Sequence, residues 1–491
     1  MKKLLSVILA ITLVLTAFSA FAEDAGNTPP EAPPGGFGGG NPPGDPPGEP
    51  PEGFSGSNPP ELPGGSGGGT PPGGFGGGTP PGALSADITY VAATEINGDT
   101  SFKTQIDETY TSDTADENAL LIMQAGVTLD NPSVFKTGDS DGGDNCNFYG
   151  LNAAVLIKDG ADVVITGGTV ESSASGANGV FVYGGNGGRN SAAGDGTTLH
   201  ISDTMITTTG DGSGGIMTTG GGVTYAENLT VTTSGRSSAP IRTDRGGGTV
   251  VVDGGTYTSN GLGSPAIYST AKITVKNATL VSNLSEGVCI EGMNSIALEN
   301  CDLTADNTQC NGHASFLDSI MIYQSMSGDA DSGTSSFTMT GGSLTSLSGH
   351  MFHVTNTHAV ITLSGVKLVN EGSDVLLSVC DDGWSGSSNT AELAADAQTL
   401  SGTILVGSNS TLTLTLKNGS AFEGCFSGNI TNAKGEQVSA ETGTVNVSLD
   451  ETSTWTLTAD TDITSFSGSA ANVISNGYTL TVNGVELSGT N

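Results

Sequence analysis

Apolar residues recur with a fixed spacing through the central part of the chain. In each unit two apolar residues are separated by one residue, and a bend-forming residue lies two positions after the pair. One more apolar residue follows three positions later, as in VVVDGGTYTS at 250–259 and ITVKNATLVS at 273–282. A period of two is typical of strands with one buried face. The spacing therefore predicts a strand, a corner and a second strand in every unit.

The unit aligns eight times between residues 163 and 368. The bend position holds Gly, Asn or Asp in every unit but the third, where Glu227 stands. These three residue types tolerate the left-handed backbone of a sharp corner. The aligned apolar pairs are Val163/Ile165, Leu199/Ile201, Val223/Tyr225, Val250/Val252, Ile273/Val275, Ile296/Leu298, Phe337/Met339 and Ile361/Leu363.

A further short strand precedes each unit, for example GVFVYGG, PIRTDRG or AIYSTAK. Three short strands per cycle cannot bury their apolar faces alone, whereas stacked cycles form a continuous core. The sequence thus predicts an all-β parallel β-helix, a solenoid, with inserted loops at 184–196, 324–335 and 380–390. A β-sandwich of antiparallel hairpins is the alternative, although it gives no reason for one corner position to recur.

The N-terminal part has a different composition. Residues 1–22 combine two lysines, an apolar run and a small-x-small site, which predicts a secretory signal peptide. Residues 23–83 are rich in Pro and Gly and are predicted to be a disordered linker. Residues 84–491 are then the β-helix domain, with capping strands at its C-terminal end. We expect a secreted or loosely cell-surface-associated, extracellular protein without a transmembrane segment.

Charge and cysteine content narrow the function classes. The chain has 14 basic and 50 acidic residues, a formal net charge of −36, which disfavours nucleic acid and anionic membranes as partners. The six cysteines permit disulfides in an oxidising compartment. Buried reduced thiols are the other interpretation, and the spacing of the cysteines does not decide between the two.

From Val163 to Leu368 the repeat resembles the right-handed parallel β-helix, or pectate-lyase-like, superfamily. The export signal, the linker and stretches such as TMTGGSLTS are similar to secreted carbohydrate-binding and adhesin-like β-helix proteins of anaerobic Gram-positive bacteria. The superfamily also contains polysaccharide lyases and glycoside hydrolases. Of the hydrolase motifs, the chain offers a fragment only, Asp381-Asp382 with His313 and His350, so the resemblance favours binding over catalysis and assigns no catalytic residue.

The candidate glycan site comes from aligning the strands that precede the repeat. With Val180 and Ile241 pointing inward, the outward positions stack into columns of aromatic and charged residues. Aromatic faces stack on sugar rings, and Arg and Asp bind hydroxyl or carboxylate groups. A surface salt-bridge cluster is the alternative interpretation. The predicted glycan-binding residues are Phe181, Tyr183, Arg189, Arg236, Arg242, Asp244, Arg245 and Tyr268.

One acidic turn is a candidate metal site. Asp139, Asp141 and Asp144 lie in the stretch GDSDGGDN, and Ca²⁺ prefers several carboxylate oxygens from a flexible loop. A solvated acidic turn is the alternative, and the fold itself requires no cofactor. We therefore expect non-catalytic binding of polysaccharide or surface glycan. The alternatives are a polysaccharide lyase or glycoside hydrolase and a structural surface or matrix protein.

Overall fold

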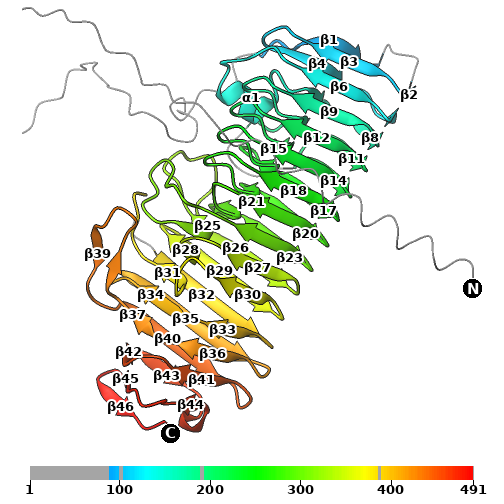
Figure 1. Cartoon of the computed structure of the whole chain (residues 1–491). Coiled ribbons are helices and arrows are strands. Elements are labelled where there is room, and N and C mark those ends of the chain that lie inside the picture. The colour runs from blue at the N-terminus through cyan, green and yellow to red at the C-terminus, as the bar shows by residue number, and fades with distance from the viewer. Residues whose placement is uncertain (1–87, 99–102, 188–192, 385–388, 490–491) are drawn as a thin grey trace, which may run out of the picture. The chain divides into compact units, whose positions relative to one another are not determined.

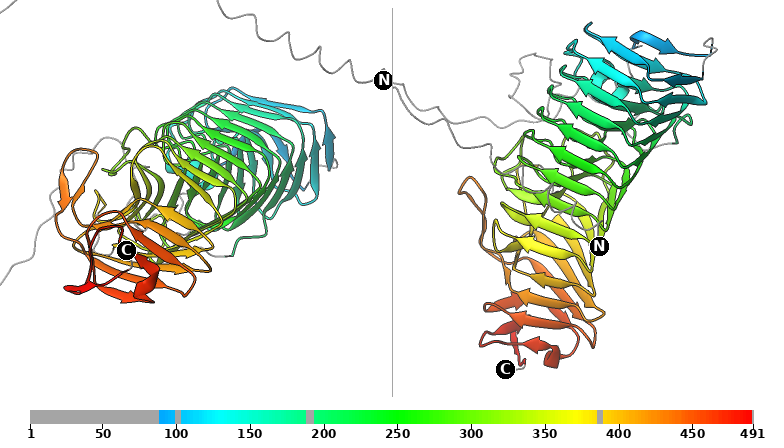
Figure 2. Two further views of the ribbon diagram at one scale, coloured as in Figure 1. Left: turned by 60° about the horizontal axis from the view of Figure 1, so that its bottom comes forward. Right: turned by 45° about the vertical axis from the view of Figure 1, so that its right-hand side comes forward.

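The computed structural model describes residues 88–98, 103–187, 193–384 and 389–489; the predictions for residues 1–83 and for Arg189 lie outside these ranges. The described chain winds into a parallel β-helix, in which each coil gives one strand to each of three sheets (Figure 1). Successive coils lie over one another along the stack (Figure 2). The predicted all-β fold is confirmed.

The first sheet contains 13 of the described strands, and they pair in parallel, as β10 does with β13. In spatial order they are β1 (Val91–Ile96), β4 (Glu117–Ile122), β7 (Val155–Ile157), β10 (Val180–Tyr183), β13 (Ile216–Thr219), β16 (Ile241–Thr243), β19 (Ile267–Ser269), β22 (Val288–Glu291), β25 (Asp318–Tyr323), β28 (His350–Thr355), β31 (Val375–Val379), β34 (Thr403–Val406) and β37 (Phe426–Ser427).

The second sheet has 14 strands within the described ranges. They are β2 (Thr104–Ile106), β5 (Val127–Asp130), β8 (Asp162–Thr166), β11 (Thr198–Ser202), β14 (Gly222–Glu227), β17 (Gly248–Asp253), β20 (Lys272–Lys276), β23 (Ser295–Glu299), β26 (Thr334–Thr340), β29 (His358–Ser364), β32 (Asn389–Asp396), β35 (Ser410–Lys417), β40 (Thr444–Leu449) and β43 (Ser465–Ser467).

The third sheet is made of the strands that follow the corner. They are β3 (Thr109–Ser112), β6 (Ser133–Lys136), β9 (Thr169–Ser172), β12 (Met205–Thr208), β15 (Thr230–Thr233), β18 (Thr256–Ser259), β21 (Thr279–Ser282), β24 (Asp302–Ala305), β27 (Ser343–Ser346) and β30 (Lys367–Asn370). A separate ladder continues this side of the stack with β33 (Thr399–Ser401), β36 (Ala421–Gly424), β41 (Thr454–Leu457) and β44 (Val473–Ile474).

The remaining described elements are short. An antiparallel hairpin and a small three-stranded sheet lie near the C-terminal end, a helix lies between β6 and β7, and a 3-10 turn precedes β44. They are β38 (Ile430–Thr431), β39 (Gln437–Ser439), β42 (Thr461–Ile463), β45 (Leu480–Val482), β46 (Val485–Leu487), α1 (Asp144–Tyr149) and η1 (Ala470–Asn472).

Inward-pointing side chains of the three sheets form one continuous core along the stack. Leu280 pairs in register with Leu303, and Leu303 with Leu344, and all three are fully buried. Burying one such side chain stabilises the fold by about 1.5–3 kcal/mol. The repeated apolar positions of the sequence are therefore the rungs of this core.

Asparagine and aspartate stabilise the corner between the second and third sheets. Asn228 and Asn277 both adopt the left-handed conformation, with φ of 52° and 54°. The side-chain amide of each donates to a carboxylate one coil earlier, Asn228 to Asp203 and Asn277 to Asp253, at 2.7 Å in both cases. The bend position of the repeat thus meets two requirements, because the side chain that tolerates the corner also ties it to its neighbour.

The predicted register of the third unit is wrong by one residue. In β14, the side chains of Thr224 and Ala226 point into the core of the β-helix, and Tyr225 points to solvent. Thr224 pairs with Leu199, and its hydroxyl hydrogen-bonds the Thr218 hydroxyl at 2.7 Å inside the core. A slip of one residue exchanges the two faces of a strand. The corner residue is accordingly Asn228 and not Glu227.

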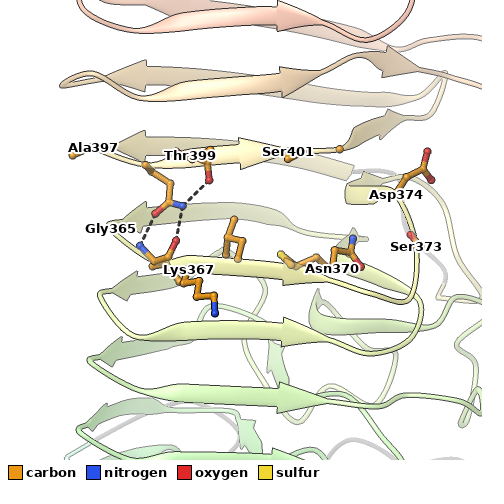
Figure 3. A pocket seen from close by; sticks show the side chains of 13 residues that line it. Gly365, Lys367, Asn370, Ser373, Asp374, Ala397, Thr399 and Ser401 are labelled. Carbon is orange, nitrogen blue, oxygen red and sulfur yellow. Dashed lines mark hydrogen bonds between the residues drawn. The ribbon is translucent and has the colours of Figure 1, made fainter.

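The third sheet is interrupted after β30. The coils on either side of the break still pair in the first two sheets, β28 with β31 and β29 with β32, but in the described chain no ladder joins β30 to β33. The side chain of Gln398 spans the break: its Nε2 donates to the carbonyl of Val366 at 2.8 Å, and its Oε1 accepts from the Val366 N–H at 2.7 Å (Figure 3). A cleft of about 710 Å³ remains beside this bridge.

Candidate functional site

Three of the predicted glycan-binding residues, Phe181, Arg242 and Tyr268, share the outer face of the first sheet, in the register expected from the sequence. Phe181 pairs with Met217, Met217 with Arg242, and Arg242 with Tyr268. The column continues through Cys289 and beyond. The stacking of these positions from one coil to the next is confirmed.

The exposure that we expected for this column is corrected by the structure. Phe181 is fully buried, and Arg242 and Tyr268 are each only 6% exposed, because loops and helix α1 cover this face of the sheet. A cavity of about 10 Å³ lies beside Arg242 and Tyr268, which is room for about one water molecule. Glycan binding by these residues stays a prediction and would require the covering segments to move.

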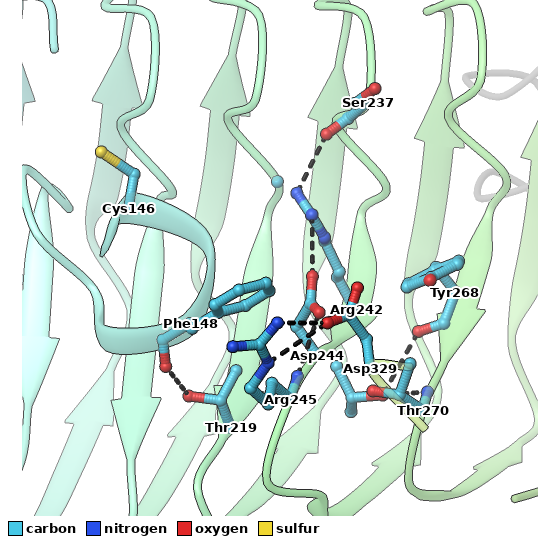
Figure 4. Close-up of polar contacts among 12 residues, drawn as sticks. Cys146, Phe148, Thr219, Ser237, Arg242, Asp244, Arg245, Tyr268, Thr270 and Asp329 are labelled. Atoms are coloured by element: carbon cyan, nitrogen blue, oxygen red, sulfur yellow. Dashed lines mark hydrogen bonds and ion pairs between the residues drawn. The ribbon is translucent and has the colours of Figure 1, made fainter. Parts of the chain in front are cut away.

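Arg242, Asp244 and Arg245 form a network beneath the loop that follows β25 (Figure 4). Arg242 donates to Asp244 at 3.0 Å, and Arg245 pairs with Asp329 of that loop at 2.5 Å. The Arg245 guanidinium also lies 4.1 Å from the ring centre of Phe148 in α1. Burial raises the pKa of Asp244 to about 7, although Arg242 acts in the opposite direction. The network fastens the loop and the helix to the sheet.

Glu291 is the centre of a second buried polar group. Its carboxylate accepts a hydrogen bond from the Tyr268 hydroxyl at 2.5 Å and from the Tyr323 hydroxyl at 3.2 Å, and it also contacts Ser325. Burial raises the pKa of Glu291, and these hydroxyl donors offset part of that rise. Burial and the neighbouring Glu291 also raise the pKa of Tyr268 well above its usual range. The two tyrosines therefore act as donors to a carboxylate that solvent does not reach.

The other predicted residues have separate surroundings. Arg236 donates to the side-chain oxygen of Asn311 at 2.7 Å, in a loop from a later coil. Tyr183 is half-buried and packs edge-on against Tyr149 of α1, with ring centres 5.6 Å apart. These two residues contact the covering segments, whereas Arg189 falls outside the described ranges.

The fragment that resembles a hydrolase motif is also part of a buried attachment. Asp382 accepts from the N–H groups of Ser315 at 2.8 Å and of Gly383 at 2.6 Å, and it lies 3.4 Å from His353. Burial opposes ionisation, but His353 and the other donors together lower the pKa of Asp382. Asp382 therefore holds two loops against the sheet.

Two further residues of this region have perturbed pKa values. Burial lowers the pKa of His350 to about 4. Asp318 is 1% exposed, and its pKa is raised well above the usual value by burial and by the charge of Glu286. A perturbed pKa marks a catalytic candidate only where substrate can reach the group, and the Asp318 side chain is closed off.

The predicted metal site is not assembled. Among the described residues, no three His, Cys, Asp or Glu side chains converge in a way that could hold a metal ion. Asp139 accepts from the N–H of Ser175 at 2.8 Å, Asp141 is exposed, and Asp144 begins α1. The acidic turn is thus the start of the covering helix.

The sequence reasoning missed Glu291, Tyr323 and His353. A signal for the first two was present, because the stretch GVCIEGM aligns with AIYSTAK and places Glu291 and Tyr323 in the same column as Asp244. His353 continues the column of Arg242 and Tyr268 through Met321. Extending the alignment by three coils would have found all of them.

An exposed aromatic surface lies instead on the second sheet. His200 of β11 and Tyr225 of β14 are register partners with ring centres 4.8 Å apart and ring planes inclined by 16°. Tyr225 is 42% exposed, and Val164 extends the surface by one rung at 39%. We call His200, Tyr225 and Val164 the aromatic platform.

The cysteines are unpaired within the described chain. All six have free thiols, and five of them are buried. Of the two interpretations that the sequence left open, the structure agrees with reduced thiols in a packed interior.

No protein-family model, curated protein or solved structure matches this chain. The described residues contain no helix that is long and apolar enough to cross a membrane.

Proposed function

We propose that this protein is an exported, extracellular β-helix of the pectate-lyase-like type that binds polysaccharide or surface glycan without cleaving it, as adhesins do. The observation that carries the proposal is the aromatic platform: two stacked rings and an apolar neighbour whose side chains are exposed on the second sheet. Exposed aromatic rings pack against the C–H faces of sugar rings.

The surroundings of the platform suit a neutral sugar chain. Glu227 and Asp253 are exposed register partners two residues along the strands from Tyr225 and its partner Val251. Their carboxylates can accept hydrogen bonds from sugar hydroxyls. Successive rungs of a parallel sheet are about 4.8 Å apart, comparable with the length of a sugar ring, so a glycan that runs along the stack would meet one rung per ring.

Catalysis is less well supported than binding. The carboxylates with raised pKa values, Asp244, Glu291 and Asp318, lie under loops and are 5% exposed or less. Glycoside cleavage requires two carboxyl groups on either side of an accessible bond. A polymer cannot reach these side chains without rearrangement of the covering loops.

A glycan array with the full-length protein tests the proposal, with pectic and mucin glycans in the panel. We expect retention on at least one neutral polysaccharide, and a loss of about tenfold or more in Tyr225→Ala and His200→Ala. Phe135→Ala is the matched control, because Phe135 is an aromatic residue of similar exposure, 38%, on the third sheet.

Three results would contradict the proposal. Equal retention by Tyr225→Ala and the wild type would remove the platform as the binding site, and an empty array would favour a structural surface or matrix role. Release of reducing ends or of unsaturated sugars from a bound polymer would favour a hydrolase or lyase.

A further inference from the structure

The break between β30 and β33 leaves two strand edges facing each other. The N–H and C=O of one residue point to the same side of a strand, and the side alternates along the chain. The backbone of Val366 faces β33, where it bonds the side chain of Gln398, whereas Lys367 donates to Gly342 on the β27 side at 3.0 Å. By alternation, the backbone groups of Leu368 and Asn370 point into the cleft.

The opposite edge is arranged in the same way. Gln398 donates from its backbone N–H to Ser420 at 3.1 Å, and its carbonyl accepts from the N–H of Ala421 at 3.0 Å, so it faces β36. The backbone groups of Thr399 and Ser401 therefore face the cleft. Nε2 of Gln398 also donates to the carbonyl of Thr399 at 2.7 Å, so on this edge the groups of Ser401 are the ones offered to a further strand.

The core is open at the same place. The residue that pairs with Leu368 one coil earlier, Leu344, is fully buried, as are its counterparts in the preceding coils, whereas Leu368 is only half-buried. Beside it, Asn370 donates to the carbonyl of Val375 at 2.9 Å, but among the described residues nothing donates to its buried side-chain oxygen. An apolar contact and a hydrogen-bond donor are both missing from the break.

We propose that this break is a docking site for an extended peptide segment of another polypeptide, which adds one rung between β30 and β33. Its backbone pairs with Leu368 and Asn370 on one side and with Ser401 on the other. One apolar side chain points inward against Leu368. Two residues further along the bound peptide, a Ser or Thr faces Asn370. The residues that occupy this inward position in earlier coils, such as Ser346 and Ser282, are small.

The chemistry of the cleft favours a peptide over a sugar chain. Gln398 already fills one end, and its primary amide bonds to Val366 as a peptide group would (Figure 3). The coils close again at the other end, where the N–H of Thr403 donates to the carbonyl of Asp374 at 2.7 Å. Between these two contacts the backbone amides of Leu368, Asn370 and Ser401 face the cleft in strand order, and β-strand addition satisfies such an array.

A synthetic hexapeptide with the sequence of residues 342–347, Gly-Ser-Leu-Thr-Ser-Leu, is the probe, because it copies the apolar-x-Ser pattern of a neighbouring rung. We expect it to bind the full-length protein and to slow hydrogen exchange at the N–H groups of Leu368, Asn370 and Ser401. The same peptide methylated on the backbone nitrogens of its first leucine and its threonine keeps every side chain but loses donors on both sides. We expect it to bind at least tenfold more weakly.

Substitutions in the protein supply the second test. Leu368→Ala should weaken binding of the hexapeptide about tenfold, and Val369→Ala, on the same strand but pointing outward, should change it less than twofold. Absence of binding at millimolar peptide, equal binding of the methylated peptide, or the same amide protection by an oligosaccharide would each overturn the proposal. The peptide comparison is made on the wild-type protein, so it holds even if Leu368→Ala does not fold.

Discussion

Arg242 and Asp244 form an ion pair of 3.0 Å in which each side chain is 7% exposed, on the outer face of a sheet that is fully covered there. Asp244 loses its hydration on folding, because its side chain is buried in this pair. Burial outweighs Arg242, so the pKa of the Asp244 carboxyl rises to about 7. The carboxyl therefore takes up a proton near neutral pH in the folded protein, whereas an unfolded Asp does so near pH 3.9.

The protein should gain stability from Asp244 as the pH falls from 8 to 5. A raised folded-state pKa means that the folded state binds more protons in this window, so the contribution is present at pH 5 and lost by pH 8, and it is worth about 2–3 kcal/mol. Urea unfolding at both pH values measures it as the difference between the wild type and Asp244→Asn. The pKa of His350 is lowered by burial, so its contribution to stability changes with pH in the opposite direction. This contribution is the same in the wild type and in Asp244→Asn and cancels in the difference.

Asp130→Asn, a change of an exposed aspartate on the second sheet, is the control and should leave the pH dependence as in the wild type. Identical pH dependence in Asp244→Asn and the wild type would mean that Asp244 stays ionised to well below neutral pH, held by Arg242.

Thr224→Val should destabilise the protein by about 1–3 kcal/mol, because it leaves the buried hydroxyl of Thr218 without its partner. The double variant Thr218→Val/Thr224→Val should recover most of that loss, since it removes both hydroxyls together. Denaturant unfolding of the three proteins measures the coupling. Val223→Ala is the check on the register: a larger loss there than in Thr224→Val would restore the register predicted from the sequence.

The fold was predictable because the residue type at each corner and core position is enough to identify that position in the repeat. Asn277 and Leu280 recur one coil later as Asn300 and Leu303, and this spacing can be recognised without knowledge of the rest of the chain. The error in the third unit has a local cause. Val223 and Tyr225 are more apolar than Thr224 and Ala226, and the hydrogen bond that allows Thr224 into the core is made with another strand.

The burial of the candidate site could not be predicted in the same way. The register of Arg242 and Tyr268 follows from strand alternation, but their cover comes from distant parts of the chain. Asp329 lies 84 residues from Arg245, and Phe148 precedes Arg245 in another coil. Alternation shows that a side chain points outward and says nothing about a loop that folds over it.

The corner at Asn277 should tolerate Gly better than Ala. Both substitutions remove the amide that donates to Asp253, so that loss cancels in the comparison. Ala must then adopt a φ of 54°, which costs about 1–2 kcal/mol for a residue with a Cβ. Thermal unfolding should place the midpoint of Asn277→Ala about 1–3 °C below that of Asn277→Gly. Equal midpoints would mean that the corner relaxes to another backbone conformation.

The six thiols should be free in the purified protein and should differ in reactivity. Burial raises the pKa of Cys146 to about 11 and that of Cys289 well above its usual range, whereas Cys310 is half-buried. Thiolate is the reactive form, so at pH 8 we expect iodoacetamide to modify Cys310 first and the other thiols only after denaturation.

Intact-mass measurement should then show six adducts in denaturant without a reducing agent. Fewer than six adducts would reveal a disulfide. Rapid modification of Cys289 in the native protein would show that the segments covering Tyr268 and its neighbours open. Such opening would make the buried column accessible to a glycan.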